Sequence, residues 1–215
     1  MKKHIAILDP FPRTLKLIFS KDKFKKLKSN YKLIYAPKKN KKNFYDKNIQ
    51  NVSFIIGQPD LSKDLLIKAK KLKAVINVES NFMNNMDYQY CFKKGIHVIA
   101  TSPVFSKPVA EIALGMTLSL LRNIHTAHSD FIKGKEKYGL ESNINASLLS
   151  GKKIGLLGFG DLAKSLYPLL LPFSKDINVY DPWIPKLNIQ KLGFKSISLN
   201  KMFESCEVIY VLATV

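Results

Sequence analysis

The chain has 215 residues, of which 46% are hydrophobic and 11% aromatic, and this composition excludes a disordered or fibrous protein. The formal net charge of +19 suggests nucleic-acid binding, but all except two of the 35 basic residues are lysines, and they are spread along the chain. Proteins that read bases or clamp phosphates usually use arginine for its bidentate fork. We therefore expect a solvated basic surface and no nucleic-acid partner, although steeply salt-dependent binding of duplex DNA would favour that alternative.

The cysteines and the apolar runs bear on metals and membranes. Cys91 and Cys206 have no metal-ligand spacing and no clustered histidines, so we expect no metal and a reducing, cytoplasmic setting. The apolar run at 5–8 is shorter than the core of a signal peptide. The run at 112–121 is too short to span a membrane and contains polar residues, so we expect no membrane partner.

In the first hundred residues, short apolar runs alternate with segments of helical periodicity. The predicted strands are 4–9, 31–36, 52–57, 73–78 and 96–101. The predicted helices are 12–24, 62–72 with Ser62 as a cap, and 86–95 stopped by Gly95. Apolar strands in strict alternation with helices indicate a parallel sheet covered on both faces. The sequence therefore predicts an α/β, flavodoxin-like domain over 1–104.

A second unit follows a boundary expected near 102–108. We predict one long helix over about 107–134, a polar loop to 147, and then a new β-α-β series. The strands of that series are expected at 153–159, 177–181, 196–199 and 207–214, with helices at 161–173 and 200–206. This pattern predicts the first half of a Rossmann domain, a doubly wound parallel sheet, over 105–215. Because a complete sheet of this kind continues through more units, we expect the chain to be the N-terminal part of a longer architecture.

A glycine-rich turn lies between the first strand and the first helix of this second series. Gly158 allows a tight turn, Gly160 lets a pyrophosphate approach the backbone, and the small Ala163 lets the helix pack on the strand. Asp181 ends the next strand, 18 residues beyond Ala163, where its carboxylate can accept from ribose hydroxyls and favour NAD over NADP. The predicted cofactor contacts also include Phe159, Asp161, Leu162 and Pro182. A purely structural turn and a methyltransferase-type nucleotide pocket remain as alternatives.

Several segments in this order resemble the D-isomer-specific 2-hydroxyacid dehydrogenases, of the phosphoglycerate-dehydrogenase-like kind. They are 72–103, 106–124 with Val109, Ala110 and Glu111, 148–166, and 179–183. The resemblance implies an NAD-dependent oxidoreductase that transfers hydride between NAD and a 2-hydroxy or 2-keto acid substrate. It also implies a homodimer formed through the region of the long helix. Ser106, Ala213 and Thr214 are expected near the cofactor on the same basis.

The sequence departs from the family's pattern in one loop. Where the family has a glycine-rich loop for the substrate carboxylate, this chain has residues 78–82. Glu79 could repel a carboxylate, whereas the backbone amides of Ser80 and Asn81 could bind an anion. A loop that only packs two domains together is the alternative.

The family's catalytic residues have no match in this chain. Hydride transfer in the family uses an arginine, a glutamate and a histidine that follow the last matched segment. No arginine follows Arg122 and no histidine follows His128, so we assign no catalytic residue, including His97 and His125. We expect the chain alone to bind NAD weakly or not at all and to be inactive. The alternative is a non-catalytic dinucleotide-binding module.

Overall fold

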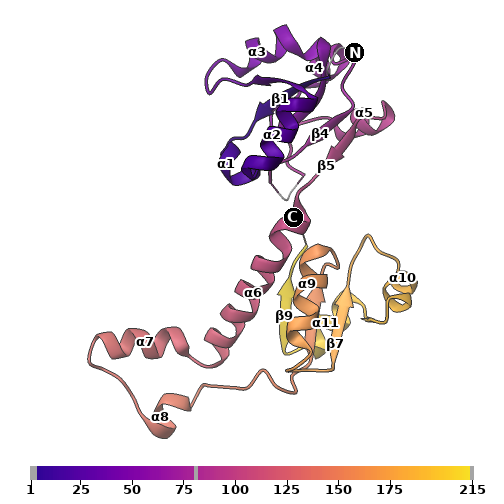
Figure 1. Ribbon diagram of the computed structural model, residues 1–215. Helices are drawn as coiled ribbons and strands as arrows, with labels where there is room; N and C mark the ends of the chain where they lie inside the picture. Colours follow the sequence, from indigo (N-terminus) through magenta and orange to yellow (C-terminus); the bar gives the residue numbers. More distant parts are fainter. Residues whose placement is uncertain (1–3, 80–81, 214–215) are drawn as a thin grey trace. The chain divides into compact units, whose positions relative to one another are not determined.

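The computed structural model describes residues 4–79 and 82–213 and divides the chain into two compact units (Figure 1). The N-terminal unit comprises residues 1–102, and the C-terminal unit comprises residues 103–215. Each unit has its own parallel sheet, with one apolar core on each face of the N-terminal sheet and one core in the C-terminal unit.

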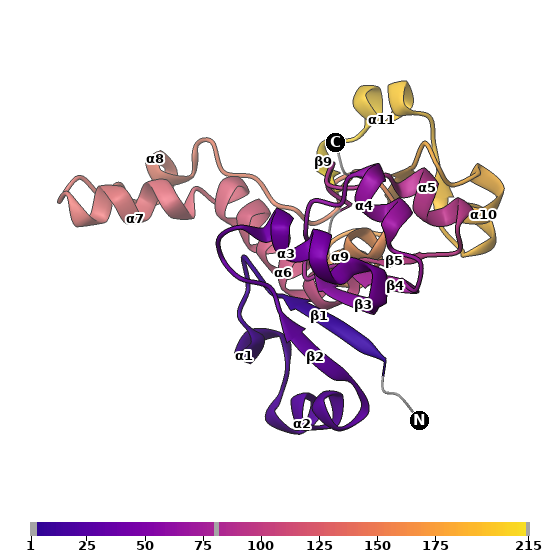
Figure 2. The same cartoon turned by 90° about the horizontal axis from the view of Figure 1, so that it is seen from above.

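The N-terminal unit contains a five-stranded parallel sheet in the order β2-β1-β3-β4-β5. Its strands are β1 (Ile5–Asp9), β2 (Lys32–Tyr35), β3 (Val52–Gly57), β4 (Ala74–Ile76) and β5 (His97–Ile99). The first three lie side by side (Figure 2). This is the flavodoxin-like order, in which the direction of strand addition reverses beside β1, and it confirms the predicted fold class.

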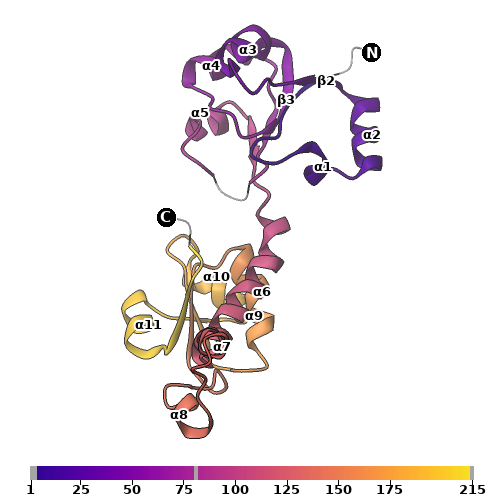
Figure 3. The same cartoon turned by 90° about the vertical axis from the view of Figure 1, so that its left-hand side faces the viewer.

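Helices cover both faces of this sheet because its central strands are apolar on both sides. One face holds α3 (Lys41–Asn48), η1 (Ile49–Asn51), α4 (Lys63–Lys68) and α5 (Tyr88–Lys93); the other holds α1 (Leu15–Ile18) and α2 (Lys21–Asn30) (Figure 3). Successive residues of β4 point to opposite faces of the sheet. Val75 packs in the core under α3, η1, α4 and α5, whereas Ile76 packs in the core under α1 and α2.

Capping residues explain why two of the predicted helices were confirmed and one was wrong. Ser62 caps α4, because its hydroxyl accepts a hydrogen bond from the N–H of Leu65 at 3.4 Å, and Gly95 has a φ of +70° just past α5. The single helix expected over 12–24 was wrong. Ser20 instead has extended backbone and caps a second helix, α2, by accepting from the N–H of Lys23.

The C-terminal unit contains a four-stranded parallel sheet in the order β8-β7-β6-β9. Its strands are β6 (Ile154–Leu157), β7 (Ile177–Tyr180), β8 (Lys195–Ser196) and β9 (Val208–Val211). This corresponds to the first four strands of the Rossmann order, as predicted. Helix α11 (Leu199–Ser205) covers one face, and α9 (Asp161–Leu170) and α10 (Lys186–Lys191) belong to the other (Figure 3).

The long helix expected over 107–134 is two helices, α6 (Ser102–Leu121) and α7 (Ile124–Ile132). The break occurs at Asn123, whose left-handed backbone (φ +53°) cannot continue a helix. A short helix, α8 (Gly139–Asn143), lies in the segment expected to be a loop. By length and composition α6 could cross a membrane, but Ala110, Leu114 and Leu118 pack one of its faces on the core of the C-terminal unit.

Candidate functional site

The turn between β6 and α9 places Gly158 where a side chain does not fit. Its φ is +97°, and its N–H donates to the carbonyl oxygen of Tyr180 at 2.7 Å, which ties the turn to β7. A Cβ atom on Gly158 would lie 2.8 Å from the backbone nitrogen of Ala213. The glycine therefore lets the segment after β9 pass directly against the turn, and this places Ala213 beside it.

Gly160 has a different role from Gly158. Its backbone is extended, with a φ of −82°, and apart from its own chain neighbours no heavy atom of the described residues lies within 4 Å of the position that its Cβ would take. Gly160 is the N-cap residue of α9, and no side chain in the described ranges caps that helix. The first-turn N–H groups are consequently available to an anion, and the open space beside them suits a phosphate.

Asp161 adds a negative charge to the same helix end. Its side chain is exposed and belongs to the first turn of α9. A carboxylate there interacts favourably with the helix dipole but repels a phosphate bound to the same N–H groups. The N-terminus of α9 thus offers N–H donors that favour phosphate binding and a carboxylate that opposes it.

The side chains of the other turn residues are anchored in the core. Phe159 and Ala163 are fully buried and Leu162 is half-buried. The Phe159 ring packs edge-to-face against Phe194, with the ring centroids 4.6 Å apart. These residues hold the turn in place, and only their backbones can face a ligand.

Asp181 connects the turn to the loop that follows β7. Its Oδ2 accepts a hydrogen bond from the N–H of Phe159 at 2.7 Å, and its Oδ1 accepts from the N–H groups of Trp183 and Ile184 at 2.8 and 3.0 Å. A carboxylate has about four acceptor positions, so one remains for a ligand hydroxyl. The neighbouring Pro182 is exposed, and Trp183 is 90% exposed.

The remaining predicted cofactor contacts are only partly brought together. Ser106 is buried in α6, and its hydroxyl donates to the carbonyl oxygen of Pro103 at 3.1 Å. Within the described ranges, no hydrogen bond links it to the glycine turn. Thr214 lies outside the described residues.

In the N-terminal unit, Glu79 forms an ion pair that was not predicted from the sequence. Arg13 donates through Nε and an Nη nitrogen to the two carboxylate oxygens of Glu79, at 2.7 and 3.0 Å. This pairing raises the pKa of the Arg13 guanidinium. The two residues are 66 positions apart, so no local pattern indicates their contact. Ser80 and Asn81 lie outside the described residues.

A second polar cluster lies at the end of β1. The buried carboxylate of Asp9 accepts from Lys41 Nζ at 2.7 Å and from the Tyr45 hydroxyl at 3.1 Å. Burial, followed by the charge and hydrogen bond of Asp9, raises the pKa of Tyr45. Because each polar atom has a partner, this cluster serves to satisfy a buried charge.

A cleft of about 680 Å³ lies beside this cluster in the N-terminal unit. It is lined by side chains of both charges from α3 and α4. Among them, Lys68 and Asp46 pair at 2.8 Å, and this hydrogen bond lowers the pKa of Asp46. We interpret this cleft as a solvated surface whose charged side chains pair with one another, and not as a ligand site.

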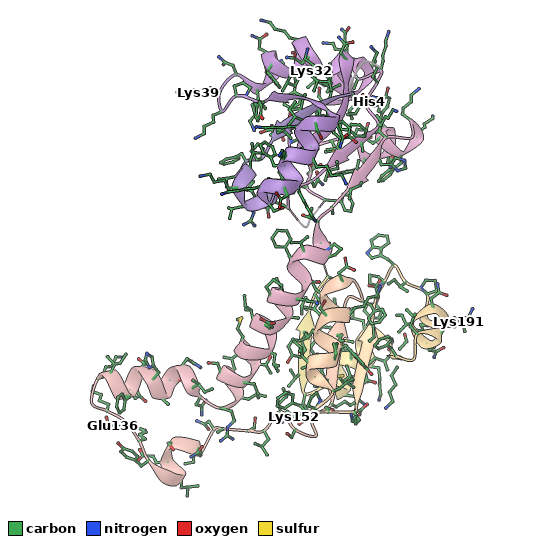
Figure 4. The ribbon with its side chains drawn as sticks, viewed as in Figure 1. His4, Lys32, Lys39, Glu136, Lys152 and Lys191 are labelled. Atoms are coloured by element: carbon green, nitrogen blue, oxygen red, sulfur yellow. The ribbon has the colours of Figure 1, made fainter. Side chains whose placement is uncertain are left out.

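The described histidines show no arrangement typical of a catalytic site. His4 contacts Ser53 and His125 contacts Thr126, and in the described part of the chain no histidine pairs with a carboxylate. Nor does any group of histidine, cysteine and acidic residues there have the arrangement of a metal site. The lysines labelled in Figure 4 come from separate elements of both units, and Lys39 and Lys191 extend away from the ribbon.

Comparison with known proteins gives one matching family and many relatives. Residues 114–215 match the family described as D-isomer specific 2-hydroxyacid dehydrogenase, NAD binding domain. A D-3-phosphoglycerate dehydrogenase of Methanocaldococcus jannaschii is 29% identical over 154 residues, which cover 69% of this chain and 28% of the relative. A hydroxypyruvate reductase of Thermotoga maritima is 30% identical over 150 residues, which cover 69% of this chain and 46% of the relative. The chain thus spans less than half the length of these two curated relatives.

Solved structures agree with this similarity. A phosphoglycerate oxidoreductase from Rhizobium etli superposes with a TM-score of 0.82 at 40% identity, covering 96% of this chain and 65% of that one. An NAD-dependent formate dehydrogenase from Staphylococcus aureus, solved in complex with NAD, gives a TM-score of 0.65 at 25% identity, covering 96% and 63%. The two-unit fold of this chain therefore recurs in longer dehydrogenases.

Proposed function

Because the chain belongs to the D-isomer specific 2-hydroxyacid dehydrogenase family, we propose that its C-terminal unit binds NAD at the turn 158–163. The turn is proposed to serve hydride transfer between NAD and a small 2-hydroxy or 2-keto acid, in a cytoplasmic enzyme. The observation that carries this proposal is the contrast between the two glycines. Gly158 is sterically required by the fold, whereas the side of Gly160 is open next to the unpaired N–H groups of α9.

The residues of this turn fit a dinucleotide. The N-terminus of α9 would hold the pyrophosphate, and Asp181 would accept from a ribose hydroxyl, since one acceptor position remains after its three backbone hydrogen bonds. A 2′-phosphate at that place would meet the Asp181 carboxylate and be repelled, which favours NAD over NADP. The bound nicotinamide would supply the hydride chemistry, while the protein orients the two reactants.

The N-terminal unit is proposed to contact the acid substrate. Its sheet presents the loops after β1 and β4 at one edge, where α/β folds usually bind ligands. The sequence contains no arginine or histidine that can be matched to the family's proton-transfer machinery. We therefore expect weak NADH binding and no turnover by the 215-residue chain alone, which is the behaviour of a dinucleotide-binding module.

We also propose that the protein forms a homodimer through α6. Ile112, Met116 and Leu120 recur at a spacing of four on one side of this helix and are 61, 61 and 62% exposed. The opposite side packs on the core through Ala110, Leu114 and Leu118. A helix that is apolar on both sides favours burial of its second face against another copy.

Trp183 gives a direct test of NADH binding. It is the only tryptophan, is 90% exposed and lies two residues after Asp181. Saturable quenching of its fluorescence by NADH, with energy transfer to the nicotinamide, would support the proposed site. Gly160→Ala should reduce that signal, whereas S-adenosylmethionine should not compete. Absence of saturation at millimolar NADH would contradict the site, and turnover of 2-keto acids by the chain alone would contradict its proposed inactivity.

A further inference from the structure

The Arg13–Glu79 ion pair joins two loops at one edge of the sheet. Arg13 follows β1 and Glu79 follows β4, and these strands are separated in the sheet by β3. The direction of strand addition reverses beside β1 and β3, and ligands of open α/β sheets bind outside the carboxyl ends of the strands at such a point. The pair therefore spans the end of the sheet at which a ligand is expected.

The geometry of the pair matches that of a carboxylate ligand. Two guanidinium nitrogens of Arg13 contact the two oxygens of the Glu79 carboxylate, at 2.7 and 3.0 Å. A free organic acid presents the same two oxygens in the same plane. Arg13 is the only arginine of the N-terminal unit, since Arg122 belongs to the other unit.

The pair is also exposed enough to exchange partners. The Arg13 and Glu79 side chains are 41% and 24% exposed. Ion pairs of this exposure contribute little net stability, because solvent screens them and their side chains lose entropy. An incoming acid can therefore replace Glu79 on Arg13 with only a modest loss of affinity.

Two residues close to Glu79, one in sequence and one through a backbone hydrogen bond, have buried side-chain polar atoms without a partner in the described ranges. The Asn77 side chain is fully buried, and neither its amide oxygen nor its nitrogen has a partner among the described residues. The same holds for the buried Oγ1 of Thr101, whose backbone N–H donates to the carbonyl oxygen of Glu79 at 3.4 Å. Buried polar groups are nearly always satisfied, so this segment has spare hydrogen-bonding capacity for a polar ligand.

We propose that Arg13 is the carboxylate-recognition residue of the N-terminal unit, and that Glu79 occupies it in competition with the acid ligand. Glu79 then sets a threshold: an acid binds only when it displaces an internal carboxylate that is always present. The pair selects ligands with two carboxylate oxygens in one plane over simple anions such as chloride. The inference rests on the proposed function only for the choice of an organic acid as the ligand.

The presence of only two arginines makes partner exchange directly observable. In ¹⁵N-labelled full chain without nucleotide, sodium oxalate is titrated at constant ionic strength, and the Nε–Hε signals of Arg13 and Arg122 are followed. We expect the Arg13 signal to shift saturably and the Arg122 signal to stay in place. Glu79→Gln should tighten oxalate binding about two- to fivefold, because the competitor has gone. Arg13→Gln should abolish saturable shifts of the Asn77 and Thr101 backbone amides.

Controls distinguish exchange from a structural ion pair. Asp46→Asn breaks the comparable exposed pair with Lys68 and should leave oxalate binding unchanged. Arg13→Lys retains the charge without the fork and should bind at least about tenfold more weakly. The proposal is overturned if Glu79→Gln binds oxalate no more tightly than the wild type, or if chloride shifts Arg13 equally. Since no nucleotide is present, these outcomes are independent of the NADH test at Trp183.

Discussion

The Asp181 carboxylate accepts a hydrogen bond from the backbone N–H of Phe159 at 2.7 Å, although the two residues are 22 positions apart. The residue proposed to bind ribose therefore also fixes the turn proposed to bind pyrophosphate. A substitution at this position changes both the ligand contact and the shape of the turn.

We expect Asp181→Ala to reduce both stability and NADH affinity. It removes the acceptor of three backbone N–H groups, and hydrogen bonds to a charged group contribute about 1.5–3 kcal/mol each. NADH affinity should fall about tenfold or more, and thermal denaturation should show a lower midpoint. Asp181→Asn retains one acceptor oxygen and should be intermediate in both measurements. Unchanged affinity in Asp181→Ala would exclude the ribose contact.

The two glycines should respond differently to alanine. Gly158→Ala places a side chain at a positive φ, which costs about 1–3 kcal/mol, and moves it against the backbone of Ala213. Gly160→Ala has room and an ordinary φ, so it should be neutral or stabilise by up to about 1 kcal/mol. Its Cβ would instead occupy the space proposed for the pyrophosphate. Chemical denaturation should show that Gly158→Ala loses stability. Calorimetric titration should show that Gly160→Ala loses NADH binding while keeping its stability.

Asp161→Asn should strengthen NADH binding. The substitution removes the charge that repels phosphate at the N-terminus of α9 while leaving the N–H donors in place. A change of about 0.3–1 kcal/mol corresponds to a roughly two- to fivefold gain in affinity, and the gain should shrink at high salt. Glu204→Gln, an exposed substitution outside the turn, is the matched control. A loss of affinity in Asp161→Asn would mean that this carboxylate contacts the ligand favourably.

The proposed dimer predicts that Met116→Glu weakens self-association. The substitution places a charge in the middle of the exposed apolar side of α6. Sedimentation velocity should then show a shift from dimer to monomer. Leu17→Glu changes a residue that is 74% exposed in the N-terminal unit and should have no such effect. A wild-type chain that remains monomeric at high concentration would contradict the dimer.

Glu207 should make the C-terminal sheet sensitive to acid. Its carboxylate binds Lys152 Nζ at 2.9 Å and accepts from the N–H of Lys153 at 3.0 Å, and these hydrogen bonds lower the pKa of Glu207 from its ordinary value of 4.5. A lowered pKa contributes stability above pH 4.5 that is lost as the pH falls through the folded-state pKa. The melting difference between wild type and Glu207→Gln should therefore be present at neutral pH and disappear in acid.

Strand positions and the glycine turn were predictable from sequence because their signals are local. Apolar runs indicated the strands. The β-α-β unit was indicated by the spacing of Gly158, Gly160 and Asp181. Helix α3 was missed because a lysine-rich segment gives little apolar periodicity. The break at Asn123 depends on the backbone conformation of a single residue.

Contacts between distant segments were beyond local reasoning. Sequence reasoning assigned Glu79 a repulsive charge, because its arginine partner lies 66 residues earlier. The second role of Asp181, as an acceptor for the turn, likewise depends on the register of β6 and β7. Such contacts follow from the sheet topology as a whole.

The hydrogen bond between Asp181 and Phe159 has a consequence for how the proposed preference for NAD can change, whether in evolution or by redesign. Exchange of the acid for a neutral or basic residue is the usual first step toward a 2′-phosphorylated nucleotide. In this chain a replacement residue that lacks a side-chain oxygen also removes the acceptor that holds the turn. A successful switch therefore requires a compensating acceptor for the Phe159 N–H, so coenzyme choice and turn stability must change together.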